Sequence, residues 1–138
     1  MATPKTVAAR EWLAKAEDDL AMARAAQTLA PPRFGSGVFH CQQVAEKALK
    51  GFLFLHDCPF EKTHDLRDLV RVCKQIEGSF DALLSDARLL TPFAVIYRYP
   101  GGHTPPTREE FDSALAAAER VFRFVLSKHP ELDPENPI

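Results

Sequence analysis

Long hydrophobic runs, paired cysteines and a strong net charge are all missing from this sequence of 138 residues. The richest apolar stretch, residues 51–55, is far shorter than the roughly 20 residues that a membrane-spanning helix needs. The first ten residues contain no apolar run of the kind found in secretory signals. The three cysteines, Cys41, Cys58 and Cys73, form no CxxC pair, which disfavours a disulfide framework or a zinc site. We therefore expect a cytoplasmic protein with free thiols and no membrane contact.

The net charge is small, but the charges are unevenly distributed. Lys and Arg total 17 and Asp and Glu total 19, a formal charge of −2, which excludes a protein coated in positive charge for nucleic acid. No acidic residue lies between Asp86 and Glu109. That stretch contains Arg88, Arg98 and Arg108, together with His103. A local basic patch of this kind binds phosphate even when the net charge is near zero. For Arg88 we prefer the alternative that it complements the dipole of a helix C-terminus.

Common catalytic motifs are also absent. The sequence contains no HExxH, P-loop, GxGxxG or GxSxG motif, and its five histidines show no metal-ligand spacing. We therefore expect no metal site and no cofactor.

Helical periodicity dominates the sequence, and no window alternates at period two for long enough to predict a sheet. Proline and glycine separate the predicted helical segments, which are residues 5–29, 37–56, 65–77, 80–99 and 107–128. The length favours one domain, with a core of about residues 10–126 and a flexible tail at 130–138. The expected fold is all-α: an antiparallel up-and-down bundle of four main helices plus a shorter fifth.

Several residues are candidates for helix ends. Ser36 is expected to cap the second segment, and Thr63 or Asp65 the third. Pro92 interrupts the fourth segment, so Thr91 is expected to cap a short second piece. The last segment begins with Thr107-Arg-Glu-Glu110, the pattern of a capping box.

One loop combines residues that suit phosphate chemistry. In the stretch 97–103, Arg98 and His103 flank a Pro-Gly-Gly turn. Arginine offers a forked donor for phosphate oxygens, and histidine transfers protons near neutral pH. The pair therefore suits cleavage of a phosphodiester without a metal, in which His103 helps remove the proton of a 2′-hydroxyl and Arg98 stabilises the developing charge. The competing interpretation is that this spacing arose by chance.

Two further polar groups have both functional and structural interpretations. On the second segment, one polar stripe either lines a groove or forms a solvated face; it consists of His40, Gln43, Lys47 and Lys50. His64 precedes a helix start, where it binds a ligand or simply packs. Asp19 lies beside the apolar stripe of the first segment, so we expect it to have a partner at the edge of the core.

The order of these motifs resembles the HEPN family, small helical domains often described as nucleotide-binding. The resemblance covers about residues 10–126 and rests on five features in order: Trp12 with Ala16-Glu-Asp-Asp-Leu20, His40-Cys-Gln-Gln-Val-Ala-Glu-Lys-Ala-Leu-Lys50, Lys62-Thr-His-Asp-Leu66, Tyr97-Arg-Tyr-Pro100 and a final amphipathic helix. It implies a four-to-five-helix bundle that is usually a homodimer. It also implies a minimal nucleotidyltransferase partner, often in a toxin–antitoxin pair.

The resemblance also bears on catalysis. Many members are metal-independent RNases that use an Arg followed four to six residues later by a His, with the two copies meeting across a dimer. Arg98 and His103 match that spacing. Toxin-type members usually have a small polar residue after the Arg and often a Tyr two residues after the His, whereas this sequence has Tyr99 and Pro105.

Three functional hypotheses follow. The first is a nucleotide- or RNA-phosphate-binding module, with binding residues Lys47, Lys50, His64, Arg98 and Tyr99. The second is a metal-independent endoribonuclease, a toxin that uses Arg98 and His103 across a dimer. The third is a non-catalytic structural adaptor, and the sequence leaves open whether the protein is an enzyme.

Overall fold

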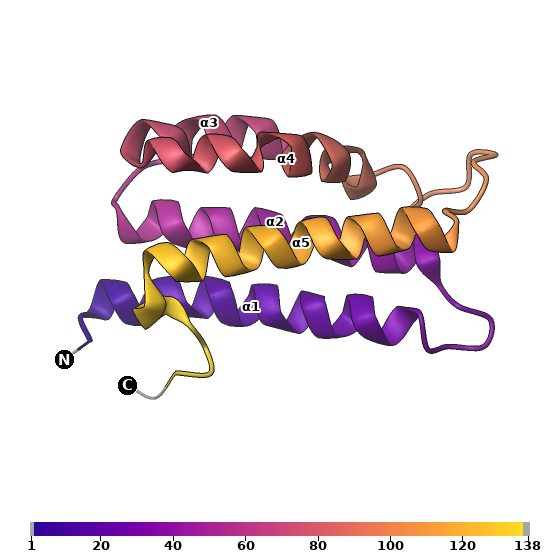
Figure 1. Ribbon diagram of the computed structural model, residues 1–138, viewed down its shortest axis with the longest axis horizontal. Helices are drawn as coiled ribbons and strands as arrows, with labels where there is room; N and C mark the ends of the chain where they lie inside the picture. The colour runs from indigo at the N-terminus through magenta and orange to yellow at the C-terminus, as the bar shows by residue number, and fades with distance from the viewer. Residues whose placement is uncertain (1, 137–138) are drawn as a thin grey trace.

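The computed structural model describes residues 2–136, and the regular secondary structure in this part of the chain is all helical, without strands. Five α-helices form a bundle (Figure 1): α1 (Pro4–Ala26), α2 (Phe34–Leu55), α3 (Leu66–Ile76), α4 (Leu84–Leu90) and α5 (Arg108–Lys128). Short 3-10 helices cover Gly78–Leu83, Thr91–Ala94 and Pro130–Leu132. This confirms the expected all-α bundle. Among the helices of the described residues, none has the length and apolarity required to cross a membrane.

The helices form three tiers, with α1 on one side of the α2–α5 pair and α3 with α4 on the other (Figure 1). Helices α2 and α5 run in the same direction: the rings of Phe34 and Phe111, near their starts, lie 5.3 Å apart, and His56 meets His129 just after their ends. Helix α3 also runs parallel to α2, because the connecting segment 56–65 returns along α2 before α3 begins. The expected up-and-down alternation therefore holds between α1 and α2 and between α4 and α5, and this connection interrupts it.

Two glycines in α2 allow its neighbours to approach closely. A Cβ on Gly37 would lie 2.5 Å from Cε1 of Phe111, and a Cβ on Gly51 would lie 2.5 Å from Cδ2 of Leu13. Phe111 and Leu13 are both completely buried. These two positions therefore set how tightly α2 packs against α5 and α1.

The helix ends follow local chemistry, with two corrections. The Thr107 hydroxyl accepts from the Glu110 amide while the Glu110 carboxylate accepts from the Thr107 amide, which confirms the capping box. Asp65 caps α3 as expected. The prediction that Ser36 caps α2 is wrong, because α2 begins at Phe34 and Ser36 lies inside its first turn. Thr91 does not cap a second piece; its hydroxyl accepts from the Leu66 amide and donates to a carbonyl of α4.

The C-terminal segment also differs from expectation. Residues 130–136 were expected to form a flexible tail, but Leu132 is fully buried in the core. The Arg10 side chain donates to the backbone carbonyls of Asp133 and Asn136 at 3.0 and 2.6 Å. One apolar side chain and one donor from α1 thus hold the segment against the bundle. Positions 137 and 138 of the expected tail lie outside the described residues.

Candidate functional site

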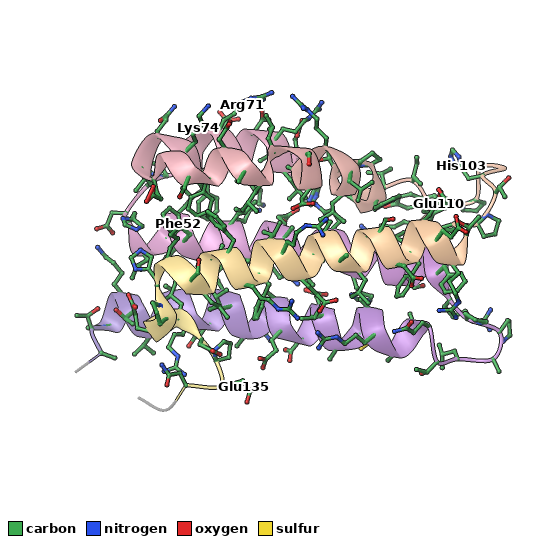
Figure 2. The ribbon with its side chains drawn as sticks, in the orientation of Figure 1. Phe52, Arg71, Lys74, His103, Glu110 and Glu135 are labelled. Carbon is green, nitrogen blue, oxygen red and sulfur yellow. The ribbon has the colours of Figure 1, made fainter. Side chains whose placement is uncertain are left out.

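The loop after α4 folds back over the first turn of α2, at the end of the bundle where α2 and α5 both begin (Figures 1 and 2). A groove of about 540 Å³ lies between them. Its walls are Arg33 and the residues 34–36 on one side, and on the other the loop residues 96–106 apart from Arg98 and Thr104. We call this region the arginine end, defined by Arg33, Arg98 and Arg108.

The first turn of α2 supplies hydrogen-bond donors to this groove. The first amides of an α-helix have no partner within the helix, and the helix dipole makes that end positive. In α2 these amides belong to Phe34, Gly35 and Ser36, which line the groove. A Cβ on Gly35 would lie only 3.2 Å from Cβ of Tyr97, so the loop approaches the backbone here as closely as glycine allows. Such a helix start is suited to bind a phosphate.

Arg98 lies in a smaller hollow of about 240 Å³ beside the groove. Its guanidinium covers the ring of Phe39, with its carbon 4.6 Å from the ring centroid. Within residues 2–136, no carboxylate lies within ion-pair distance of Arg98, and the side chain is exposed. Stacking on Phe39 orients the guanidinium plane and leaves its N–H groups available for an anion.

The same hollow contains a histidine that a buried carboxylate orients. His40 lines it together with Arg98. The Nδ1 atom of His40 lies 2.8 Å from Oδ1 of Asp19, and Lys47 donates to the other carboxylate oxygen of Asp19. Asp19 is only 7% exposed, so the expected partner at the edge of the core is confirmed. Asp19 assigns the Nδ1 proton of His40 and fixes the ring beside Arg98.

His103 lies at the tip of the loop (Figure 2) and lines the larger groove. Its ring centroid is 6.3 Å from that of Tyr97. Arg98 and His103 thus line two adjoining hollows, which share Gly35, Ser36 and Tyr97. In the described part of one chain, no hydrogen bond joins Arg98 to His103. Tyr99, 63% exposed, lines the groove on the same loop and presents a ring on which a base could stack.

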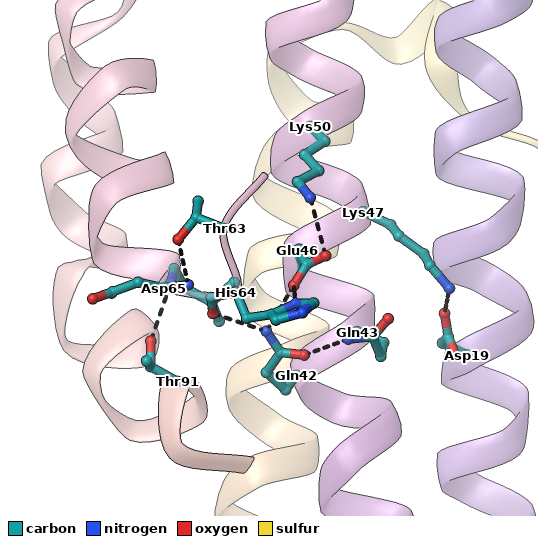
Figure 3. Close-up of polar contacts among 11 residues, drawn as sticks. Asp19, Gln42, Gln43, Glu46, Lys47, Lys50, Thr63, His64, Asp65 and Thr91 are labelled. Carbon is teal, nitrogen blue, oxygen red and sulfur yellow. Dashed lines mark hydrogen bonds and ion pairs between the residues drawn. The ribbon is translucent and has the colours of Figure 1, made fainter. Parts of the chain in front are cut away.

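Lys50 and His64 belong to a separate network in the middle of α2 (Figure 3). Lys50 is 8% exposed and its Nζ lies 3.1 Å from a carboxylate oxygen of Glu46. Nδ1 of His64 lies 2.8 Å from the other oxygen, and the Gln42 amide donates to Glu46 and to the His64 carbonyl. Burial by itself raises the pKa of Glu46, but the bonds from His64, Gln42 and Lys50 outweigh it and lower the pKa below its usual value. Both candidates therefore bind Glu46.

The structure adds one group that sequence reasoning did not place at the site, Arg33, and it locates a second, Arg108, that belongs to the predicted basic stretch. Arg33 lines the groove directly before α2. The Arg108 guanidinium lies 5.0 Å from the Phe34 ring centroid and donates to Gln27. Two glycines among residues 34–37, directly after Pro32 and Arg33, could have indicated a site at this helix start. They did not, because the helix was predicted to begin at residue 37.

A family model and one similar solved structure indicate the same family. The family model described as HEPN domain matches residues 9–129. The crystal structure of TT1696 from Thermus thermophilus is 28% identical, with a TM-score of 0.77, over 87% of this chain and 97% of that one. The crystal structure of ST0689, an archaeal HEPN homologue, is 25% identical, with a TM-score of 0.68, over 87% and 96% of the two chains. No curated protein matches.

Proposed function

The chain belongs to the HEPN domain family, and from this premise we propose that it binds a nucleotide or an RNA phosphate at the arginine end. The observation that carries the proposal is the position of Arg98 beside the first turn of α2. Its guanidinium is stacked on Phe39, and Gly35 and Ser36 line the same hollow. A phosphate there would accept from the guanidinium and from the free amides, while the base would stack on Tyr99.

The other expected binding residues have a supporting role in this proposal. Lys47 pairs with Asp19, which holds His40 beside Arg98. Lys50 forms an ion pair with Glu46 and His64 forms a hydrogen bond with it, and both contacts thereby support α2. The direct contacts come from Arg98, Tyr99 and the start of α2.

The test is a titration of the purified protein with ATP and with a short single-stranded RNA at low salt. We expect saturable binding that weakens as salt rises. Losing the charged hydrogen bonds of Arg98 in the Arg98→Ala variant should weaken binding by about 10- to 100-fold. Arg88→Ala is the matched control, since Arg88 is exposed but lines neither hollow. The absence of saturable binding, or an equal loss in both variants, would contradict the proposal.

We also propose that the protein forms a homodimer and works with a minimal nucleotidyltransferase in a toxin–antitoxin-like pair. Exposed apolar side chains near the arginine end support an interaction surface, namely Leu89, Val95 and Tyr99. Light scattering after gel filtration measures the dimer, and co-purification with a neighbouring nucleotidyltransferase measures the pair. Co-purification that no nucleotide or RNA alters, without any binding of these ligands, would favour the structural adaptor.

A second candidate function, metal-independent RNA cleavage, is favoured by the Asp19–His40 pair in the hollow of Arg98. A histidine would accept the proton of a 2′-hydroxyl as its oxygen attacks phosphorus, and Arg98 would stabilise the charged phosphorane. The bond from phosphorus to the 5′-oxygen would then break, and this oxygen would leave with the proton returned by the same histidine, which gives a cyclic phosphate end. His40 lies beside Arg98 in the same chain. His103 would have to approach through loop movement or from a second copy.

Cleavage of RNA in excess chelator distinguishes these histidines. Loss of activity in His40→Ala but not in His103→Ala assigns the proton transfer to His40. The opposite result assigns it to His103. Equal activity in wild type, both variants and Arg98→Ala would contradict this function while leaving phosphate binding to be judged by the titration.

A further inference from the structure

Two histidines meet at the opposite end of the bundle from the arginine end. His56 directly follows α2 and His129 directly follows α5. Their Nε2 atoms lie 2.8 Å apart, and both rings pack on Phe52, with centroid distances of 4.5 and 5.5 Å. The two rings come from residues 73 positions apart in the sequence, and each presents the same nitrogen to the other. This arrangement takes no part in the proposed phosphate site.

A carboxylate orients one of these rings. Nδ1 of His129 lies 3.0 Å from Oε1 of Glu131, which assigns a proton to Nδ1 and leaves the lone pair on Nε2. Histidines that bind a metal almost always donate their other N–H in this manner.

The electrostatic surroundings also favour a cation between the two rings. The C-termini of α2 and α5 converge here, and each helix dipole places partial negative charge at its last carbonyls. Lys5 is paired with the carboxylate of Asp57, and Lys128, which directly precedes His129, is paired with Glu77. A positive ion between the rings would thus be stabilised by two helix ends.

We propose that His56 and His129 form a binding site for a late first-row divalent metal ion, of the Ni²⁺, Cu²⁺ and Zn²⁺ type, through their Nε2 atoms. Imidazole nitrogen suits these ions. Bonds of about 2.0–2.1 Å at tetrahedral angles would separate the two nitrogens by about 3.3 Å, so the rings need to part by only about 0.5 Å. The proton on Nε2 of His56 would move to its Nδ1, so the neutral ring keeps one proton.

The site has an open coordination sphere and a structural consequence. Within residues 2–136, no third histidine, cysteine or carboxylate completes a cluster of three ligands, so water would fill the remaining positions. The ion would join the end of α2 to the end of α5, directly before the segment that carries Leu132 into the core. Metal binding should therefore stabilise the folded chain.

The test is a titration of the tag-free protein with NiCl₂ and ZnCl₂, monitored by calorimetry and by thermal unfolding. We expect one ion per chain and a higher Tm, whereas MgCl₂ should have no effect. His56→Gln and His129→Gln should each abolish this event. Glu131→Gln should weaken it by roughly 10-fold, as expected for an orienting partner. His103→Gln, which removes an exposed histidine elsewhere, is the matched control and should bind as wild type does.

Several results would overturn the proposal. They are the absence of a 1:1 event, wild-type affinity in His56→Gln, or an equal loss in His103→Gln. If His129→Gln fails to fold because His129 is half-buried, the exposed His56 still provides the test. Binding of Cu²⁺ gives a second readout, since two coordinated nitrogens produce a characteristic splitting in the electron paramagnetic resonance spectrum. A spectrum without nitrogen coupling would contradict the site.

Discussion

In the part of the chain that the structure describes, charged side chains are paired in the middle of α2 and unpaired at the arginine end. In the middle, Glu46 binds Lys50 and His64, and Asp19 of α1 binds Lys47 and His40. At the arginine end, the described residues offer no carboxylate within ion-pair distance of Arg33, Arg98 or Arg108. The first region satisfies its charges within the chain, whereas the second presents them to solvent.

This difference follows from burial. A buried charge without a partner costs several kcal/mol, so Glu46 and Lys50 must pair if α2 is to lie inside the bundle. An exposed arginine costs little when unpaired, and it remains available to a ligand. The comparison therefore separates residues that act on the free energy of unfolding from residues that act on binding.

The largest expected effect is the loss of stability in Glu46→Ala. Removing Glu46 leaves the Lys50 ammonium buried without its partner and the Gln42 amide without one acceptor, which should cost about 3–5 kcal/mol. Urea unfolding followed by circular dichroism measures it. Glu119→Ala is the matched control, since Glu119 pairs only with exposed arginines and its loss should cost about 0–1 kcal/mol. Equal losses of unfolding free energy in Glu46→Ala and Glu119→Ala would contradict the claim that buried ion pairs matter more for stability than exposed ones.

The second prediction concerns the stability of the fold at acidic pH, to which Glu46 contributes and the arginine end does not. Because the pKa of Glu46 is lowered in the folded state, its ionised form stabilises the protein above the usual value of 4.5, and this contribution disappears as pH falls through the lower folded value. Unfolding curves of Glu46→Gln should consequently depend less on pH below about 4.5 than those of wild type. Arginine side chains keep their charge throughout this range. Identical pH profiles for the two proteins would show that Glu46 is not the responsible group.

The third prediction concerns Thr107, which lies at the arginine end but forms its hydrogen bonds with Glu110 of the same chain. Thr107→Ala removes the capping box of α5 and should lower stability by about 1 kcal/mol. Phosphate binding at low salt should change less than twofold, because the free arginines and the start of α2 remain in place. A loss of binding as large as that of Arg98→Ala would mean that loop order, rather than free charge, governs this end.

Sequence reasoning succeeded where the signal was local. The start of α5 was predicted from Thr107 and Glu110, which bond to each other across three residues. The start of α2 was placed three residues late, because Ser36 is of a residue type that favours the N-cap position. The helix instead begins at Phe34, and Gly35 and Gly37 lie where Tyr97 and Phe111 approach the backbone.

The remaining differences depend on distant partners. Lys50 was expected on a polar face, and it is buried because Glu46 and the ring of Phe60 surround it. The docking of the C-terminal segment requires Arg10, more than 120 positions away. The hydrophobic pattern fixes which helices form, but not which charge meets which across the bundle.

The smallest expected effect is that of Gly35→Ala, which should raise the stability of the fold and weaken phosphate binding. Alanine in a helix is favoured over glycine by up to about 1 kcal/mol, so stability should rise slightly. The new Cβ would lie 3.2 Å from Cβ of Tyr97, which must move by a few tenths of an ångström and carry the neighbouring Arg98 with it. Phosphate binding should therefore weaken a few-fold.

Gly78→Ala is the control for this substitution, because its Cβ would have no neighbour within 4 Å and it lies outside the arginine end. Paired urea unfolding and nucleotide titration of the two variants provide the measurement. If Gly35→Ala raises stability and leaves binding intact, the close approach of Tyr97 to α2 does not position Arg98. If binding weakens only in Gly35→Ala, the contact between this loop and the first turn of α2 sets the geometry of the phosphate site, independently of the buried charges that stabilise the fold.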